Sequence, residues 1–237
     1  MNQDRIGNVL IVDDSRSTRV ALRTFLMKNG FAIAEAARGQ EALELVHAVE
    51  FNAVLLDIDM PGMDGIETCG RMRRQWPRLP IILMSVQDRE ERKIEALEAG
   101  ADDYVTKPFR MRELAARLRS AMRRTKALDD FEAAILIGNF LLDPEHHLVE
   151  KCGSQIHMTP KQFELLHYLM AHAGKPISHS KLLGSIWGIE HAHQVEYLRT
   201  FIRQIRIKIE DDPANPKYLL TDSGIGYRFD GGAHRDS

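Results

Sequence analysis

Residues 8–15, NVLIVDDS, decide how the first half of this chain folds. Four consecutive apolar residues at 9–12 are typical of a strand buried on both faces, and two aspartates follow at its end. The same alternation of an apolar run and an amphipathic stretch continues to Arg124. We expect strands at 8–12, 32–36, 53–56, 81–84 and 104–106, and helices at 17–29, 40–49, 66–75, 88–99 and 111–124. Five such units predict a doubly wound α/β domain with a five-stranded parallel sheet.

The pattern changes after Arg124. Residues 125–132 are polar and acidic, which favours a linker between a first domain at 1–124 and a second at 133–237. The second part predicts an α+β domain, in which Thr159 caps the first helix and Ser178 or Ser180 the second. We expect strands at 135–142 and 147–151, helices at 159–172, 178–187 and 193–210, and a hairpin at 218–229.

Composition narrows the class of protein. The chain has 237 residues and a net charge of −2, and residues 127–237 hold 11 basic against 15 acidic residues, a net of −4. DNA binding would therefore depend on local placement of charge. Cys69 and Cys152 lie too far apart in sequence for a disulfide framework, and we expect both to be buried or half-buried. No apolar run approaches the ~20 residues of a membrane span and no signal peptide begins the chain, so we expect a cytoplasmic protein.

Polar groups follow four of the expected strands. Asp13 and Asp14 follow the first, Asp57 the third, Ser85 the fourth and Lys107 the fifth. Because ligands bind at the carboxyl ends of parallel strands, we expect these groups to meet at one edge. Carboxylates that converge in this way favour Mg²⁺. Asp57 is then a candidate nucleophile toward phosphorus, with Lys107 and Ser85 stabilising the phosphoryl oxygens.

The first half resembles the receiver domain of two-component response regulators. The resemblance lies in VDDS (12–15), LLDIDMPGMDG (55–65), MSV (84–86) and GADDYVTKPF (100–109). It implies that Asp57 accepts a phosphoryl group from a sensor histidine kinase. It also implies that Mg²⁺ is held by Asp13, Asp14, Asp57 and the backbone carbonyl of Asp59. Ser85 and Tyr104 would form the switch, and Lys107 would be the lysine that the family places beside the phosphoryl group. The resemblance further implies a cis peptide bond before Pro108.

Three positions depart from the usual receiver pattern. Val86 stands where alanine is common. Asp59 and Gln87 lie two residues beyond Asp57 and Ser85, beside the expected path of the attacking water. We hypothesise that these two polar residues change the lifetime of the phosphoryl group; an unchanged hydrolysis rate after replacing both with apolar residues would refute this.

An enzymatic alternative rests on the sequence Asp57-Ile58-Asp59. It also fits the DxD motif of haloacid-dehalogenase-like phosphatases, in which the first aspartate is the nucleophile. Against it, the motif follows the third strand instead of the first, Asp102 and Asp103 precede Lys107 instead of following it, and no cap domain is inserted. We therefore expect a phosphoryl acceptor with slow self-dephosphorylation and not an enzyme.

The expected helix at 193–210 combines an apolar face with a basic one. The whole region resembles the winged-helix effector domain of OmpR/PhoB-type regulators, through residues 158–188, 195–213 and GIGYRF (224–229). HAHQVEYLR, EDDPANPKY and SGIGYRF further resemble KdpE-type regulators of potassium-transport operons. Ser223 replaces a common basic residue in the wing. The candidate DNA-contacting residues are His193, Glu196, Arg199, Thr200, Arg203, Gln204, Arg206 and Lys208 on the helix, and Thr221, Tyr227 and Arg228 on the hairpin.

The resemblance implies a homodimer that forms on phosphorylation. The implied cross-subunit pairs are Lys93 with Glu113, Asp103 with Arg117, and Asp102 with Arg124. A phosphoryl group would attract Ser85, and the space vacated would let Tyr104 turn inward. Double-stranded DNA and RNA polymerase are the further expected partners. An alternative is a second domain that binds a protein. The histidine pairs at 146–147 and 191–193 lack a second ligand set, so we expect them to be solvated or to contact phosphate.

Overall fold

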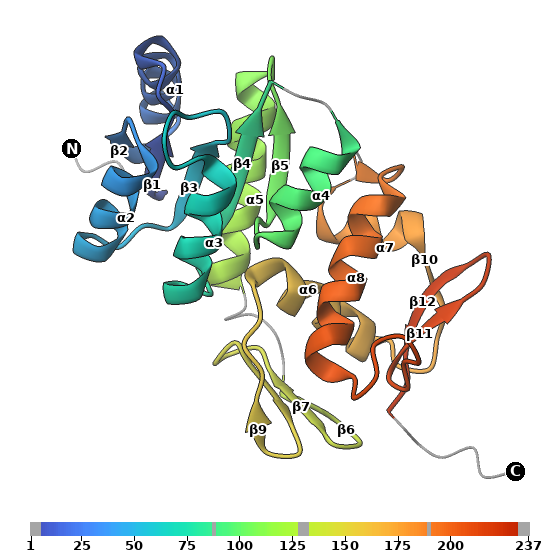
Figure 1. The fold of residues 1–237 in the computed structure, drawn as a ribbon. Coiled ribbons are helices and arrows are strands. Elements are labelled where there is room, and N and C mark those ends of the chain that lie inside the picture. Colours follow the sequence, from blue (N-terminus) through green and yellow to red (C-terminus); the bar gives the residue numbers. More distant parts are fainter. Residues whose placement is uncertain (1–5, 87–88, 128–132, 189–190, 232–237) are drawn as a thin grey trace, which may run out of the picture. The chain divides into compact units, whose positions relative to one another are not determined.

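The computed structural model describes residues 6–86, 89–127, 133–188 and 191–231. The chain divides into two compact units, Met1–Lys126 and Ala127–Ser237 (Figure 1). Among the described residues, no helix has both the length and the apolar character needed to cross a membrane.

The first unit contains the expected five-stranded parallel sheet, in the order β2-β1-β3-β4-β5. The second strand, β2, pairs with one edge of β1, and the third strand, β3, pairs with the opposite edge. β1 therefore lies between β2 and β3. The carboxyl ends of β1 and β3 therefore adjoin at the switch in strand order, where doubly wound sheets bind ligands. The strands are β1 (Gly7–Val12), β2 (Phe31–Ala36), β3 (Ala53–Asp57), β4 (Ile81–Ser85) and β5 (Asp103–Thr106).

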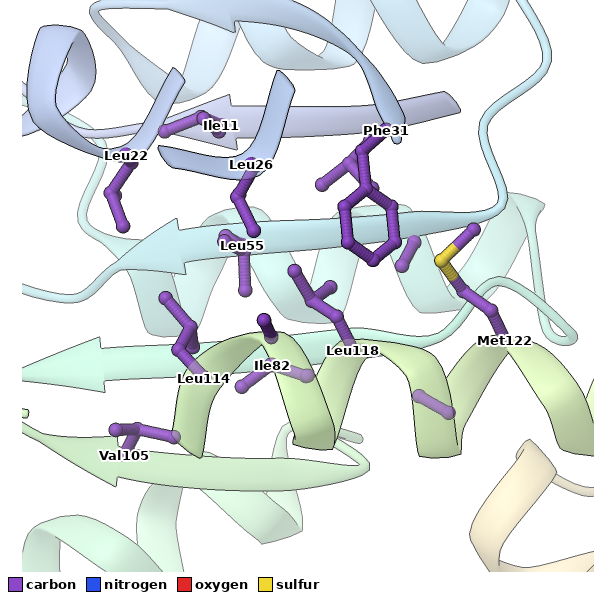
Figure 2. Close-up of a cluster of buried hydrophobic side chains, with 14 of the residues drawn as sticks. Ile11, Leu22, Leu26, Phe31, Leu55, Ile82, Val105, Leu114, Leu118 and Met122 are labelled. Atoms are coloured by element: carbon purple, nitrogen blue, oxygen red, sulfur yellow. The ribbon is translucent and has the colours of Figure 1, made fainter. Parts of the chain in front are cut away.

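Helices cover both faces of this sheet. Figure 2 shows that Leu22 and Leu26 of α1 and Leu114 and Leu118 of α5 pack on the same face, and these four side chains are fully buried there. The helices α2, α3 and α4 contact one another on the other side (Figure 1). The helices are α1 (Arg16–Lys28), α2 (Gly39–Ala48), α3 (Gly65–Gln75), α4 (Glu90–Glu98) and α5 (Met111–Ala127).

The expected linker is shorter than the sequence indicated. The helix α5 continues to Ala127, so the first three residues of the predicted linker are helical. Leu118 and Met122, four residues apart, continue the buried face of α5 into its last turns. The rest of the predicted linker, 128–132, lies outside the described residues.

In its described residues, the second unit contains three α-helices and two small antiparallel sheets. One sheet has the order β6-β7-β8-β9, and the other β10-β12-β11. Thr159 and Gln162 form a reciprocal capping box at the start of α6, and Ser178 caps α7. The elements are β6 (Ile135–Ile137), β7 (Phe140–Asp143), β8 (Leu148–Lys151), β9 (Ser154–Gln155), α6 (Pro160–Ala171), β10 (Ile177–Ser178), α7 (His179–Ile186), α8 (Val195–Ile209), β11 (Leu219–Asp222) and β12 (Gly226–Phe229).

Three features of this unit differ from the prediction, and one of them is the short strand β9, which the sequence did not indicate. The single strand expected at 135–142 is a hairpin of β6 and β7, because Gly138 adopts a φ of 56° that reverses the chain. The two-residue strand β10 was not predicted. Its pairing with β12 joins residues about 50 positions apart, and no local pattern indicates such a contact.

Candidate functional site

The three aspartates predicted at the strand ends come together. One carboxylate oxygen each of Asp13, Asp14 and Asp57 lies within 4.8 Å of the other two. Asp13 and Asp57 are buried and Asp14 is exposed. Asp13 Oδ1 also accepts a hydrogen bond from the backbone N–H of Ser15 at 2.9 Å, which fixes the loop that enters α1. Oxygen ligands in this number fit the preference of Mg²⁺.

Lys107 joins two of these carboxylates. Its Nζ lies 2.8 Å from both Asp13 Oδ2 and Asp57 Oδ1. Burial raises the pKa of Asp57 above its ordinary value; the Lys107 hydrogen bond and charge oppose this shift, and Asp13 adds to it. Burial works against the Lys107 ammonium, but the two hydrogen bonds outweigh it and raise the pKa of Lys107. The lysine thus keeps its charge beside the candidate phosphoacceptor. The peptide bond between Lys107 and Pro108 is cis, as expected.

A glycine shapes the loop after Asp57. A side chain at Gly65 would collide with the backbone of Asp57 and Ile58. The N–H of Gly65 donates to the carbonyl of Ile58 at 3.0 Å, and the Asp64 side chain caps α3 by accepting from the N–H of Glu67. The first turn of α3 therefore lies directly against the end of β3 and closes the pocket on that side.

Ser85 is hydrogen-bonded to a residue of this loop. Its Oγ donates to Asp59 Oδ2 at 3.1 Å, and the N–H of Val86 lies 3.5 Å from the same oxygen. Ser85 is buried and Asp59 is exposed. The sequence predicted the Asp59 carbonyl as a metal ligand and its side chain beside the attacking water; the structure adds that its carboxylate is a hydrogen-bond partner of Ser85. Gln87 lies outside the described residues.

Tyr104 does not match the expected starting position of the switch. The residue is 6% exposed, so its ring already lies inward without a phosphoryl group, and Lys93 Nζ lies 5.9 Å from the ring centre. The sequence prediction had this ring turn inward only after Ser85 moved. Packing beneath α4 explains the difference, since a tyrosine ring that is buried removes a large apolar area from water.

The expected dimer residues make contacts within the chain. Arg117 pairs with Asp103 at 3.0 Å and with Glu113 at 2.9 Å. Burial disfavours the Arg117 charge, but Asp103 and Glu113 outweigh it and raise the pKa of Arg117. The Asp102 carboxylate is buried and pairs with Arg73 at 2.6 Å. The side chain of Arg124 lies outside the described part of the chain.

In the second unit, α8 buries one face and exposes the other. Leu198, Ile202, Ile205 and Ile209 are buried, whereas Arg199 and Arg203 are exposed. Arg199 forms an ion pair with Glu196 one turn earlier. His193 precedes α8 and is exposed. A basic helix face that a domain leaves in solvent is suited to the major groove of DNA.

Several predicted DNA-contacting residues instead hold the domain together. Thr200 is 8% exposed, and Tyr227 is buried. The Arg206 guanidinium donates to the Leu219 carbonyl at 2.9 and 2.8 Å and to Thr221 Oγ1 at 2.8 Å, and burial lowers its pKa. These contacts tie α8 to β11, so the Arg206 guanidinium that the sequence offered as a DNA contact is engaged within the domain.

The hairpin brings little available positive charge. Arg228 pairs with both Asp222 and Asp230, each at 3.1 Å. Gly224 has a φ of 77° in the turn, and Ser223 and Ile225 are exposed. Thus the one wing cation that the sequence predicted as a DNA contact is neutralised within the chain.

Comparison with known proteins agrees with both units. Residues 9–119 match the family model for the response regulator receiver domain, and residues 153–229 match the model for the C-terminal domain of transcriptional regulatory proteins. The chain is 40% identical over 223 residues to the transcriptional regulatory protein KdpE of Mycobacterium tuberculosis, in two strains; the match covers 94% of this chain and 98% of KdpE.

This chain is a response regulator of the OmpR/PhoB family. It is a KdpE-like, DNA-binding regulator with a receiver domain and a winged-helix effector domain. Among solved structures, the OmpR/PhoB homolog DrrB of Thermotoga maritima is 31% identical, with a TM-score of 0.51, and the match covers 94% of this chain and 98% of that one. A mutant of RitR, at 24% identity and a TM-score of 0.76 over the same shares, shows a common fold.

The phosphatase alternative finds no support in the regulator's structure. It would need further carboxylates in the pocket, but Asp102 pairs with Arg73 and Asp103 with Arg117. Asp57 is the last residue of β3, the central strand of the sheet, and Asp13 and Asp14 follow the first strand, β1. Such enzymes place two acidic residues after the lysine. Asp102 and Asp103 precede Lys107 and are paired with arginines, so they do not fill these positions.

The histidines and cysteines of the regulator show two corrections. His191 is buried and packs 5.8 Å from the Tyr197 ring, so the expectation that it is solvated was wrong. Cys69 is buried, as expected, and burial raises the pKa of its thiol to about 12. Cys152 is exposed, contrary to expectation, because it occupies the β8–β9 turn with a φ of 52°.

Proposed function

We propose that Asp57 is the phosphoryl acceptor of this regulator and that Mg²⁺ binds beside it. The observation that carries the proposal is the meeting of Asp13, Asp14 and Asp57 at the ends of β1 and β3. Asp13, Asp14, Asp57 and the Asp59 carbonyl would hold the ion, and the oxygen-only donor set fits it. When bound, Mg²⁺ would offset the negative charge of the carboxylates and the phosphoryl oxygens.

The residues of the pocket divide the work of phosphoryl transfer. An Asp57 carboxylate oxygen attacks the phosphorus of a phosphohistidine on the kinase; an O–P bond forms, the N–P bond breaks, and the imidazole leaves. Lys107 and Ser85 donate hydrogen bonds to the transferred phosphoryl oxygens. Asp57 is regenerated only by slow hydrolysis, so we class the chain as a phosphoryl acceptor and not as an enzyme.

A hollow beside this pocket offers a place for the sensor histidine kinase. It measures about 820 Å³ and is lined by α1 and the start of α5, with Val20, Phe25 and Met111 as apolar walls. Arg16 and Lys28 add positive charge. Since the kinase must bring its phosphohistidine to Asp57, its docking surface has to reach this end of the sheet; the hollow begins there, at Arg16 two residues after Asp14, and extends along α1 to Lys28.

We infer that phosphorylation produces a homodimer through α4, β5 and α5. Lys93 of α4 and Glu113 of α5 are partly exposed and carry opposite charges, as a two-fold interface requires. Asp103 and Arg117 support the surface through their own ion pair. Asp102 is buried against Arg73, so we leave it out of the contact set.

The dimer would act on double-stranded DNA through α8 and regulate transcription by RNA polymerase, in the cytoplasm. On α8 and just before it, the proposed DNA-contacting residues are His193, Glu196, Arg199 and Arg203. Gln204 and Lys208 lie at the edge of this surface. Two recognition helices related by two-fold symmetry fit half-sites about one helical turn apart. The resemblance to KdpE-type regulators makes a potassium-uptake operon the proposed target.

Selection of genomic DNA on the activated protein tests the whole proposal. Fragments are incubated with the beryllofluoride-activated regulator and Mg²⁺, recovered and sequenced, with Asp57→Asn and high salt as controls. We expect a potassium-pump promoter that the Asp57→Asn variant does not enrich. A different promoter would keep the mechanism and remove the potassium assignment.

The alternative, a second domain that binds a protein, is favoured by the net charge of −4 in residues 127–237. If the second domain binds a protein instead of DNA, the selection should enrich no DNA fragment at any salt concentration. DNA binding, in contrast, falls steeply with salt because basic residues displace counterions from phosphates.

A further inference from the structure

The DNA-facing side of α8 carries an apolar side chain. Among the described residues of α8 (Val195–Ile209), Ile207 is the one large apolar residue that is exposed, at 57%. At 100° per residue, Ile207 lies almost opposite the buried row of Leu198, Ile202, Ile205 and Ile209. It therefore points away from the core, into the surface that would enter a groove.

The polar neighbours of Ile207 on α8 are engaged within the domain. Gln204 Oε1 accepts from Gln162 Nε2 at 2.9 Å. Lys208 Nζ donates to the His157 carbonyl at 2.7 Å and to Gln162 Oε1 at 2.6 Å. Thr200 is nearly buried, and its hydroxyl donates to the Glu196 carbonyl at 3.1 Å. The outward face also carries a row of three exposed side chains spaced four residues apart, Arg199, Arg203 and Ile207, in which Arg199 pairs with Glu196.

The three side chains of this row differ in what they can bind. Arginines bind phosphates or guanine edges, but an isoleucine can neither donate nor accept a hydrogen bond. The one apolar feature that a base pair presents in the major groove is the C5 methyl group of thymine. A single exposed apolar side chain needs no explanation in general. Here, however, it takes the outward position one turn beyond Arg203, on the helix that would read the sequence.

We propose that Ile207 packs against the methyl group of a thymine and so makes α8 prefer a T·A pair at that position of each half-site. The inference rests on the proposed function, since it requires α8 to lie in the major groove. Burying one methyl group stabilises a complex by about 0.8 kcal/mol, which corresponds to about fourfold in affinity.

Replacing thymine with uracil tests the contact directly, because uracil lacks only that methyl group. A duplex is first selected from a randomised library with the beryllofluoride-activated full-length protein. Each thymine is then replaced singly by uracil, and Kd is measured for the wild-type protein and for Ile207→Ala. We expect one thymine per half-site where uracil weakens wild-type binding about fourfold and leaves Ile207→Ala unaffected.

Two control variants separate the outcomes. Leu136→Ala removes a comparably exposed apolar side chain (73%) from β6 and should keep the wild-type response to uracil. Arg203→Ala should weaken binding to all duplexes. If Arg203→Ala binds as wild type, α8 does not read DNA and the proposed function fails with this inference. If Arg203→Ala binds weakly, but wild type ignores uracil at every position or Ile207→Ala keeps the uracil response, the inference about Ile207 alone is overturned.

Discussion

At the scale of single residues, the hydroxyl of Ser85 limits how the receiver can respond. A serine hydroxyl has one hydrogen to donate, and in the structure it goes to the Asp59 carboxylate. A phosphoryl group on Asp57 would need the same hydrogen. Asp59 therefore competes with the phosphoryl group for Ser85, and its charge also helps to raise the pKa of Asp57.

Removing this competitor should speed phosphorylation. We expect Asp59→Ala to react with acetyl phosphate about threefold to tenfold faster than wild type, since a hydrogen bond to a charged group contributes about a kcal/mol or more. The rate is followed by Trp76 fluorescence or by phosphate-affinity gel. Glu44→Ala, which removes an exposed carboxylate from α2, is the matched control. Equal rates for the two variants would show that the Ser85–Asp59 bond does not restrain the reaction.

At the scale of elements, β5 and α5 act as one surface because Arg117 joins them. Its ion pair with Asp103 on β5 is shielded from water, whereas Glu113 on α5, its second partner, is partly exposed. A charge reversal at Arg117 would break this internal cluster as well as a dimer contact. Lys93 and Glu113 are therefore the better positions to examine.

Reversing one charge should weaken the dimer, and reversing both should restore it. We expect Lys93→Glu to raise the dimer Kd of the beryllofluoride-activated protein about tenfold, because two-fold symmetry counts the lost pair twice. Adding Glu113→Lys should recover most of the affinity. Sedimentation velocity measures both. If Lys93→Glu has the same dimer Kd as the wild-type protein, the dimer interface does not include Lys93.

At the scale of the whole molecule, the two units can be followed separately, because each contains one of the two tryptophans, Trp76 and Trp187. Burial lowers the pKa of His167 in α6 below its ordinary value of 6.5, and the His172 charge adds to this. The unfolded chain then binds more protons than the folded one near this pH. The stability that neutral His167 contributes is thus present above pH 6.5 and is lost as the pH falls.

Acid should therefore weaken the effector domain. In a Trp76→Phe background, we expect the urea midpoint reported by Trp187 to fall between pH 7.5 and 5.5, and to fall less in His167→Gln. His146 has a raised pKa through its hydrogen bond to Asp143, so its linkage has the opposite sign. His146→Gln should therefore make the acid effect larger. An identical pH response with and without His167 would contradict the assignment.

The parallel sheet, the acidic pocket and the order of the effector helices could all be predicted from the amino-acid sequence. These follow from local patterns: apolar runs that end in Asp13, Asp57 or Lys107, and the caps at Thr159 and Ser178. In a parallel sheet the carboxyl ends of all strands lie at the same edge. The meeting of these polar residues could therefore be predicted without knowing any side-chain contact.

The hydrogen-bond partners of the polar side chains became known only from the packing of distant elements. The sequence offered Arg206, Gln204 and Lys208 as DNA contacts from their residue types and their positions along the helix, but β11 and α6 supply their hydrogen-bond partners from more than ten residues away. The same holds for Ser85 with Asp59 and for Asp102 with Arg73. The physical reason is that helical period fixes the direction of a side chain relative to its own helix, whereas its partner is fixed by how distant elements pack.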